Sequence, residues 1–153
     1  MKSIPETIAM PPVFVIMVSS KPAKKGGCVL RKLVASILED LSTREVFLFR
    51  VSCAGCGRQY ASRPVPFSKS ASIADTPAKK ALLKAVYDQE WNTAHQCALR
   101  STSQHMNYCP ICKRIVCDQC FLICDDLDMC RHCAAALDAQ GTPVLPNVID
   151  AAT

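Results

Sequence analysis

Hydrophobic residues recur at three- and four-residue steps between positions 28 and 41, which places them along one side of a helix. Arg31, Lys32 and Glu39 fall on the opposite side, where they would face water. The pattern therefore predicts an amphipathic helix over residues 28–41 that packs its apolar stripe in a core. The stripe consists of Leu30, Leu33, Val34, Ile37, Leu38 and Leu41.

A longer helix is predicted over residues 77–103. Thr76 is a favourable N-cap, because its side-chain oxygen can accept a hydrogen bond from an unpaired backbone N–H of the first turn. Pro77 suits the first helical position, where no N–H is needed. One face of this helix carries Leu83, Tyr87, Trp91, Ala94 and Ala98.

Short strands are predicted on both sides of a cysteine pair. Residues 46–51 are rich in β-branched and aromatic side chains and lead directly to Cys53 and Cys56. Gly57 then permits the positive φ that a tight metal-binding turn requires. Residues 58–62 would form the return strand. Further along the chain, a strand is expected at 115–116 and a helix at 134–137.

An apolar run over residues 12–18 precedes a basic, glycine-ended linker. We expect either a short buried strand or an apolar segment that packs on the domain or on a partner. The run faintly resembles a signal peptide, but Glu6 and the Pro11-Pro12 pair argue against export. No stretch reaches the ~18–20 apolar residues of a membrane span. A cytoplasmic location is therefore expected.

Cysteine spacing is the strongest chemical signal in the sequence. Eight of the 11 cysteines form four Cys-x-x-Cys pairs, which in a reducing compartment favour metal binding over disulfides. Eight thiolates supply two complete tetrahedral sets, so we expect two structural zinc ions. Closed all-cysteine sets leave no coordination position for water or substrate, so no enzymatic activity is expected. The pairs are Cys53/Cys56, Cys109/Cys112, Cys117/Cys120 and Cys130/Cys133.

Spacing alone leaves the grouping of the pairs open. Only four residues separate the second pair from the third, which is tight for wrapping both around one ion. We therefore favour interleaved sites, with the first and third pairs in site 1 and the second and fourth pairs in site 2. Sequential grouping is the alternative. Cys28 is expected to be a spare thiol, and His95 and Cys97 ordinary helix residues. Cys124 is expected to be a buried thiol, with replacement of Cys120 as a ligand as the alternative.

The run Cys-x2-Cys-x4-Cys-x2-Cys from Cys109 to Cys120, followed by Cys130 and Cys133, resembles the second half of a FYVE-type finger. Such fingers belong to the wider RING/FYVE/PHD set with cross-braced zinc sites. The chain is also similar to small uncharacterised bacterial zinc-ribbon proteins. The resemblance implies a treble-clef, cross-brace fold. Residues 104–110 lack the arginines that FYVE fingers use for lipid headgroups, so we expect no phosphoinositide binding.

The formal charge of +5 overstates how basic the metal-loaded protein would be. Eight thiolates and two divalent ions would bring it to about +1. The last 45 residues hold most of the cysteines and are acidic, and the basic residues elsewhere are dispersed. These features favour a protein-interaction adaptor. A nucleic-acid-binding zinc finger is the alternative, followed by a RING-like ubiquitin ligase or a thiol-redox protein.

The sequence thus predicts a small zinc-stapled α+β protein with short hairpins and a long inserted helix. Residues 1–27 are expected to be a poorly ordered N-terminal segment, and 141–153 a flexible tail. The zinc-binding domain would span 28–140. Its parts are a first knuckle at 46–62, a helical insertion at 76–104 and a Cys-rich part at 105–138.

Overall fold

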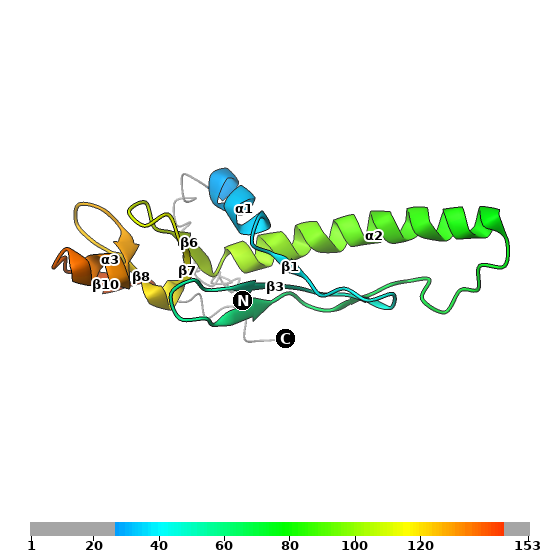
Figure 1. Cartoon of the computed structure of the whole chain (residues 1–153), viewed down its shortest axis with the longest axis horizontal. Helices are drawn as coiled ribbons and strands as arrows, with labels where there is room; N and C mark the ends of the chain where they lie inside the picture. Colours follow the sequence, from blue (N-terminus) through cyan, green and yellow to red (C-terminus); the bar gives the residue numbers. More distant parts are fainter. Residues whose placement is uncertain (1–26, 146–153) are drawn as a thin grey trace, which may run out of the picture.

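The computed structural model describes residues 27–145. The apolar run at 12–18, most of the expected N-terminal segment and residues 146–153 lie outside this range. The described part is elongated, and helix α2 (Pro77–Ser103) runs along more than half of its length (Figure 1). The Cys-rich part forms one end of the molecule, opposite the N-terminus of α2.

Helix α1 (Gly27–Ala35) is shorter than the predicted helix over 28–41. The hydroxyl of Ser36 donates to the carbonyl of Leu33 at 2.7 Å, and the Ile37 amide bonds only three residues back, to Val34. The chain then becomes extended as strand β1 (Glu39–Asp40), which pairs with strand β3 (Phe49–Ser52). Tertiary pairing therefore overrides the helical pattern, because β1 gains a strand partner.

Strands β3 (Phe49–Ser52) and β4 (Gln59–Ala61) form the predicted hairpin around the first cysteine pair. The predicted strand over 46–51 is interrupted at Leu48, and its first part is β2 (Val46–Phe47). The Leu48 carbonyl accepts a hydrogen bond from the Leu41 amide, and the Leu48 amide donates to the Ser42 hydroxyl. Strand β2, before this interruption, pairs with β5 (Val65–Pro66).

Helix α2 has the predicted bounds, and Thr76 caps it by accepting a hydrogen bond from the Lys79 amide at 3.3 Å. Its C-terminal half covers a small core cluster with no metal-site cysteine. Trp91 also donates to Asp40 at 2.9 Å, which ties the helix to β1. The buried residues of this cluster are Phe47, Phe49, Phe67, Ala94 and Ala98.

The Cys-rich part is built from very short elements. Strand β6 pairs with β7, and β8 lies between β9 and β10. The predicted strand at 115–116 and helix at 134–137 correspond to β7 and, approximately, to α3. The elements are β6 (Met106–Tyr108), β7 (Ile115–Cys117), the 3-10 turn η1 (Asp118–Cys120), β8 (Phe121–Ile123), β9 (Met129–Cys130), α3 (Arg131–Ala136) and β10 (Thr142–Pro143).

The expected tail from residue 141 differs from the structure at its start. Thr142 and Pro143 form β10 and pair with Ile123 and Leu122. Gly141 makes this close approach possible, since a Cβ there would lie 2.6 Å from the Cys124 Sγ. The Cys-rich part therefore extends to at least residue 143.

The larger core cluster combines aliphatic side chains with cysteines. Val34, Val51, Met106 and Val116 are almost completely buried in it. Five cysteines of the Cys-x-x-Cys pairs are buried in the same cluster, so sulfur replaces part of the hydrocarbon expected in a core of this size. The coarse prediction of a small α+β protein with two four-cysteine groups is confirmed. Between residues 27 and 145, no helix has the length and hydrophobicity to span a membrane.

Candidate metal centres

The structure brings the eight paired cysteines together in two groups of four. In each group, all Sγ atoms lie within 4.8 Å of one another. The grouping is interleaved along the chain, whereas the sequential alternative would have joined the first pair to the second. Site 1 contains Cys53, Cys56, Cys117 and Cys120, and site 2 contains Cys109, Cys112, Cys130 and Cys133.

The sulfur–sulfur distances fit a tetrahedral metal. In site 1, the Sγ atoms of Cys56 and Cys117 are 3.7 Å apart. In site 2, the Cys112–Cys130 distance is 3.7 Å and the Cys109–Cys133 distance is 3.8 Å. A zinc–sulfur bond of about 2.3 Å in a regular tetrahedron separates the sulfurs by about 3.8 Å. Each group can therefore hold a metal ion of that size.

The first half of each site is the same tight turn, or knuckle, formed by residues 53–58 in site 1 and 109–114 in site 2. In site 1, the Cys53 amide donates to the Arg58 carbonyl at 2.8 Å, and the Gly57 amide donates to the Cys53 carbonyl at 2.9 Å. Site 2 repeats both bonds at 2.9 Å, from Cys109 to Arg114 and from Lys113 to Cys109. The residue after the second cysteine has positive φ in both turns, +73° at Gly57 and +64° at Lys113. The predicted role of Gly57 is confirmed.

Lys113→Gly is expected to raise the free energy of unfolding by about 1 kcal/mol. A side chain in the left-handed region costs ~1–2 kcal/mol, part of which the greater freedom of glycine in the unfolded chain offsets. Denaturant unfolding of the metal-loaded protein measures the change. Lys113→Ala is the matched control, because it keeps the Cβ and should give no gain. Equal stabilisation by both substitutions would contradict the strain argument.

The second half of each site is a cysteine pair on a helical turn. Cys117 precedes η1 and Cys130 precedes α3, with nearly the same extended backbone (φ −73° for both, ψ 167° and 155°). The later cysteine of each pair follows within the same turn. Both sulfurs of a pair therefore face the same side of the turn, toward the opposing knuckle.

Backbone N–H groups surround the buried sulfurs. The Cys53 Sγ accepts from the amides of Cys117 at 3.1 Å and Gly55 at 3.3 Å. The Cys109 Sγ accepts from the Cys130 amide at 3.4 Å. The bonds from Cys117 and Cys130 join the two halves of a site, and the bond from Gly55 lies within one turn. These backbone N–H groups stabilise negative charge on the sulfurs that accept from them.

These contacts separate the thiol pKa values within each site. Burial raises the pKa of Cys53, but the three amides of Cys117, Cys56 and Gly55 outweigh it and lower the pKa to about 7. The Arg114 guanidinium, 3.4 Å from the Cys112 Sγ, is the main cause that lowers the pKa of Cys112 to about 6. Burial and neighbouring thiols raise the pKa of Cys133 to about 12. One thiol in each site is therefore poised to ionise first.

Metal affinity is expected to rise with pH across the neutral range. Thiols with raised pKa, such as Cys133, are protonated in the metal-free protein and release a proton when metal binds. Below pH ~6 Cys112 is protonated as well, so another proton must be displaced and apparent affinity falls more steeply. Competition with a chromophoric chelator between pH 5.5 and 8 measures this. A pH-independent affinity would contradict thiolate ligation.

The two sites are interlocked through shared strands. Strand β7 leaves the knuckle of site 2 and ends at Cys117 of site 1. Phe121, directly after site 1, pairs with Cys130 of site 2. Asn107 donates to Asp118 at 2.7 Å in the buried region beside β7. Neither site can therefore be assembled without positioning part of the other.

Gly55 marks the closest approach between the two halves of site 1. A Cβ at this position would lie 3.2 Å from both the Cβ and the Sγ of Cys120. Ile111 occupies the equivalent position in site 2, where it is 41% exposed and has room for a large side chain.

Gly55→Ala is expected to weaken metal binding at site 1, because the added methyl group displaces Cys120 by a few tenths of an ångström. We expect roughly a tenfold loss in affinity, equivalent to about 1.4 kcal/mol. Chelator competition on the variant measures it. Ile111→Ala is the control and should leave affinity within about twofold. An unchanged affinity in Gly55→Ala would show that the turn relaxes without cost.

The remaining cysteines lie outside both groups. Cys28 and Cys97 are exposed, and Cys124 is half-buried next to Gly141. His95 stacks on Trp91 with ring centroids 4.9 Å apart, which supports the prediction of an ordinary helix residue. The contact of Arg114 with the Cys112 Sγ was not predicted from the sequence. The place of Arg114 two residues after a knuckle cysteine, matched by Arg58, was the available signal.

Interlocked four-cysteine sites and short surrounding elements define a small α+β protein with two potential metal centres. Comparisons with protein-family models, with curated proteins and with solved structures gave no match. The function proposed for this chain therefore rests on the geometry of its own residues.

Proposed function

We propose that the protein binds two structural zinc ions and acts as a protein-interaction adaptor, without catalytic activity of its own. The supporting observation is that each potential metal site is closed by four cysteines. A catalytic zinc keeps one position for water or substrate, and four thiolates leave none. The metal ions would then hold the fold, in a treble-clef, cross-brace arrangement, while another surface binds partners.

The arrangement of sulfurs favours metal over thiol-redox chemistry. A redox pair exchanges a disulfide between its own two cysteines and needs access to an outside thiol. Here each Cys-x-x-Cys pair faces a second pair, and Cys109 and Cys117 are fully buried. Four thiolates in a tetrahedron suit zinc or iron, and zinc is proposed because closed all-cysteine sets are typical of structural zinc sites.

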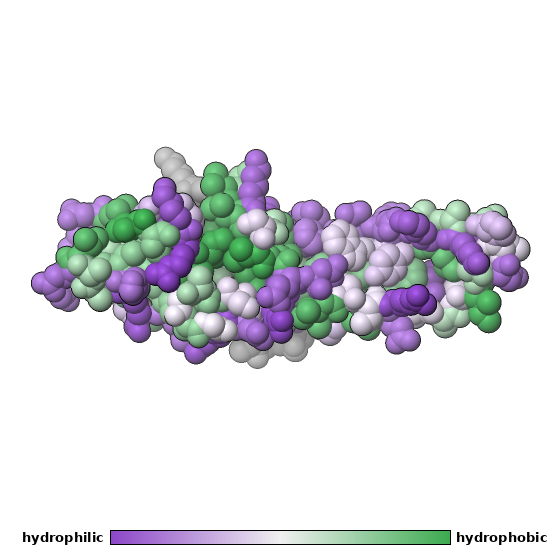
Figure 2. All heavy atoms as spheres, in the orientation of Figure 1, coloured by the Kyte–Doolittle hydropathy of each residue, from purple (hydrophilic) through white to green (hydrophobic). Residues whose placement is uncertain are grey.

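The adaptor role is supported by the surface beside the metal sites. Figure 2 shows hydrophobic surface around α1 and toward the Cys-rich end. An apolar groove with a volume of about 480 Å³ lies there. By contrast, two lysines of α2 form ion pairs with acidic neighbours, Lys79 with Asp75 at 2.7 Å and Lys84 with Asp88 at 2.6 Å. This pairing reduces the positive charge available to phosphates and disfavours the nucleic-acid alternative.

Metal stoichiometry with an absorption spectrum tests the proposal. Protein purified without added zinc is expected to contain two zinc ions per chain and to be colourless. Visible thiolate-to-iron absorption, or fewer than two ions per chain, would contradict it. A salt titration separates the partner classes, since tight nucleic-acid binding with a steep salt dependence would overturn the adaptor assignment.

A further inference from the structure

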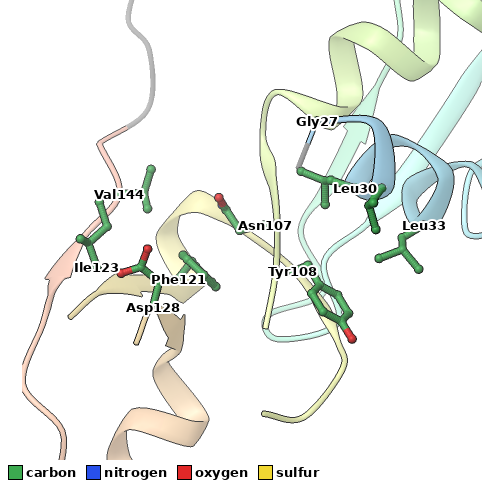
Figure 3. Close-up of a pocket in the computed structure, with 10 residues that line it drawn as sticks. Gly27, Leu30, Leu33, Asn107, Tyr108, Phe121, Ile123, Asp128 and Val144 are labelled. Carbon is green, nitrogen blue, oxygen red and sulfur yellow. The ribbon is translucent and has the colours of Figure 1, made fainter. Parts of the chain in front are cut away.

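The apolar groove lies between α1 and the strands that follow site 1. One wall is formed by α1 residues, including Leu30 and Leu33, and the other by Phe121, Ile123 and Val144 (Figure 3). Asn107 and Tyr108 of β6 lie between the two walls. Ile123 is 51% exposed, and Val29 at the lip is 63% exposed. Hydrocarbon on both walls is therefore left exposed by the described residues 27–145, which favours an apolar occupant.

The rim of the groove on the β8 side is acidic. Asp128 lines the groove itself, and Asp125 and Asp126 line an adjoining hollow that also contains Tyr108 and Phe121. All three carboxylates are exposed. Between residues 27 and 145, no lysine or arginine forms an ion pair with them. An occupant with basic residues next to an apolar run would complement both features.

The chain carries such a segment immediately before the groove. Gly27, the first described residue, is itself part of the groove lining. The apolar run of residues 13–18 is separated from it by eight residues, which extended can span about 26–29 Å. That separation contains Lys21, Lys24 and Lys25. A tethered segment also has an effective concentration near the millimolar range, far above that of a free partner.

We propose that the groove binds the chain's own segment of residues 13–25. The apolar run fills the space between α1 and β8, and the three lysines lie against Asp125, Asp126 and Asp128. This contact regulates the proposed adaptor surface, because an outside partner must displace the segment. The inference thus rests on the proposed function for its role, and on the groove, its charges and the tether for its geometry.

Photo-crosslinking in the full-length, zinc-loaded protein tests this contact. A benzophenone amino acid placed at Phe14 is expected to crosslink within the same chain to peptides that contain Leu30, Leu33 or residues 121–123. Ile123→Asp should reduce the yield at least fivefold, because it places a charge on the groove wall. The matched control is Ile73→Asp, at a site 87% exposed and remote from the groove, which should leave the yield unchanged.

Hydrogen exchange provides a second readout that does not require a probe. Amides of residues 13–18 are expected to exchange at least tenfold more slowly than in a free peptide of the same sequence. Ile123→Asp and Lys24→Glu should each reduce that protection, and Ile73→Asp should not. Zinc content is measured in every variant to show that the metal sites remain intact.

Three outcomes would overturn the inference. They are exchange of residues 13–18 at the free-peptide rate, crosslinks to the exposed part of α2 instead of the groove, and crosslinks between two chains in a mixture of isotopically distinct copies. Any of these in a protein that retains two zinc ions rejects the groove contact and leaves the proposed metal role intact. Loss of zinc from the unmodified protein would instead reject the proposed function.

Discussion

Removal of both metal ions with a chelator is expected to abolish the cooperative thermal unfolding transition. Structural zinc sites contribute about 10–16 kcal/mol of apparent free energy each, whereas whole domains are stable by only about 5–15 kcal/mol. The larger core is expected to depend directly on metal, because five of its buried residues are cysteines from the two potential sites. Without metal, these thiols repel or must be protonated, and the strands between them lose their anchors.

Calorimetry and near-ultraviolet circular dichroism, with and without chelator, measure this effect. Readdition of zinc should restore the transition, which controls for irreversible oxidation of the thiols. The second core cluster, with five buried residues including Phe47 and Phe49, is too small to sustain a cooperative domain alone. A metal-free sample that keeps its compact shape and sharp transition would refute the structural role of the metal.

Cys117→Ser is expected to reduce bound zinc from two ions to one or fewer and to destabilise the protein by several kcal/mol. Cys117 is completely buried, lies at the end of β7 and joins site 1 to the strand that leaves site 2. A serine hydroxyl at this position would leave the metal with three thiolates and the turn of Cys53 and Cys56 with one of its two opposing sulfurs, Cys120. Metal analysis and denaturant unfolding measure the two effects.

Cys28→Ser is the matched control. Cys28 is exposed on α1 and lies outside both sulfur groups. Its substitution should leave the zinc content at two and change stability by less than ~0.5 kcal/mol. A comparable loss in the two variants would mean that Cys28 has a structural role that its exposed position does not indicate.

Local sequence signals predicted the elements that depend on local chemistry. Thr76 and Pro77 specify the start of α2, and Gly57 specifies a turn with positive φ. Signals of this kind act within a few residues, so the sequence alone is sufficient to identify them. The end of α1 was not predictable in this way, because the pairing of Glu39 and Asp40 with β3 competes with the helix.

The equivalence of the two knuckles was only partly visible in the sequence. Both have a cysteine pair followed, two residues later, by an arginine, but the positive φ at Lys113 has no sequence signal comparable to Gly57. A lysine in that conformation is tolerated because the Lys113 and Cys109 amides both close the turn by hydrogen bonds. The surrounding contacts, and not residue preference, fix the backbone there.

The sequence by itself determined the number and type of candidate ligands, since cysteine identity and spacing are local properties. It also determined the course of α2, through its cap and apolar face. Only the tertiary structure decided which sulfurs meet, because that depends on contacts between residues more than 60 positions apart, such as the hydrogen bond from the Cys117 amide to the Cys53 Sγ. The structure likewise decided that β10 joins the Cys-rich sheet and that an apolar groove opens beside α1, since both arise from contacts between distant segments.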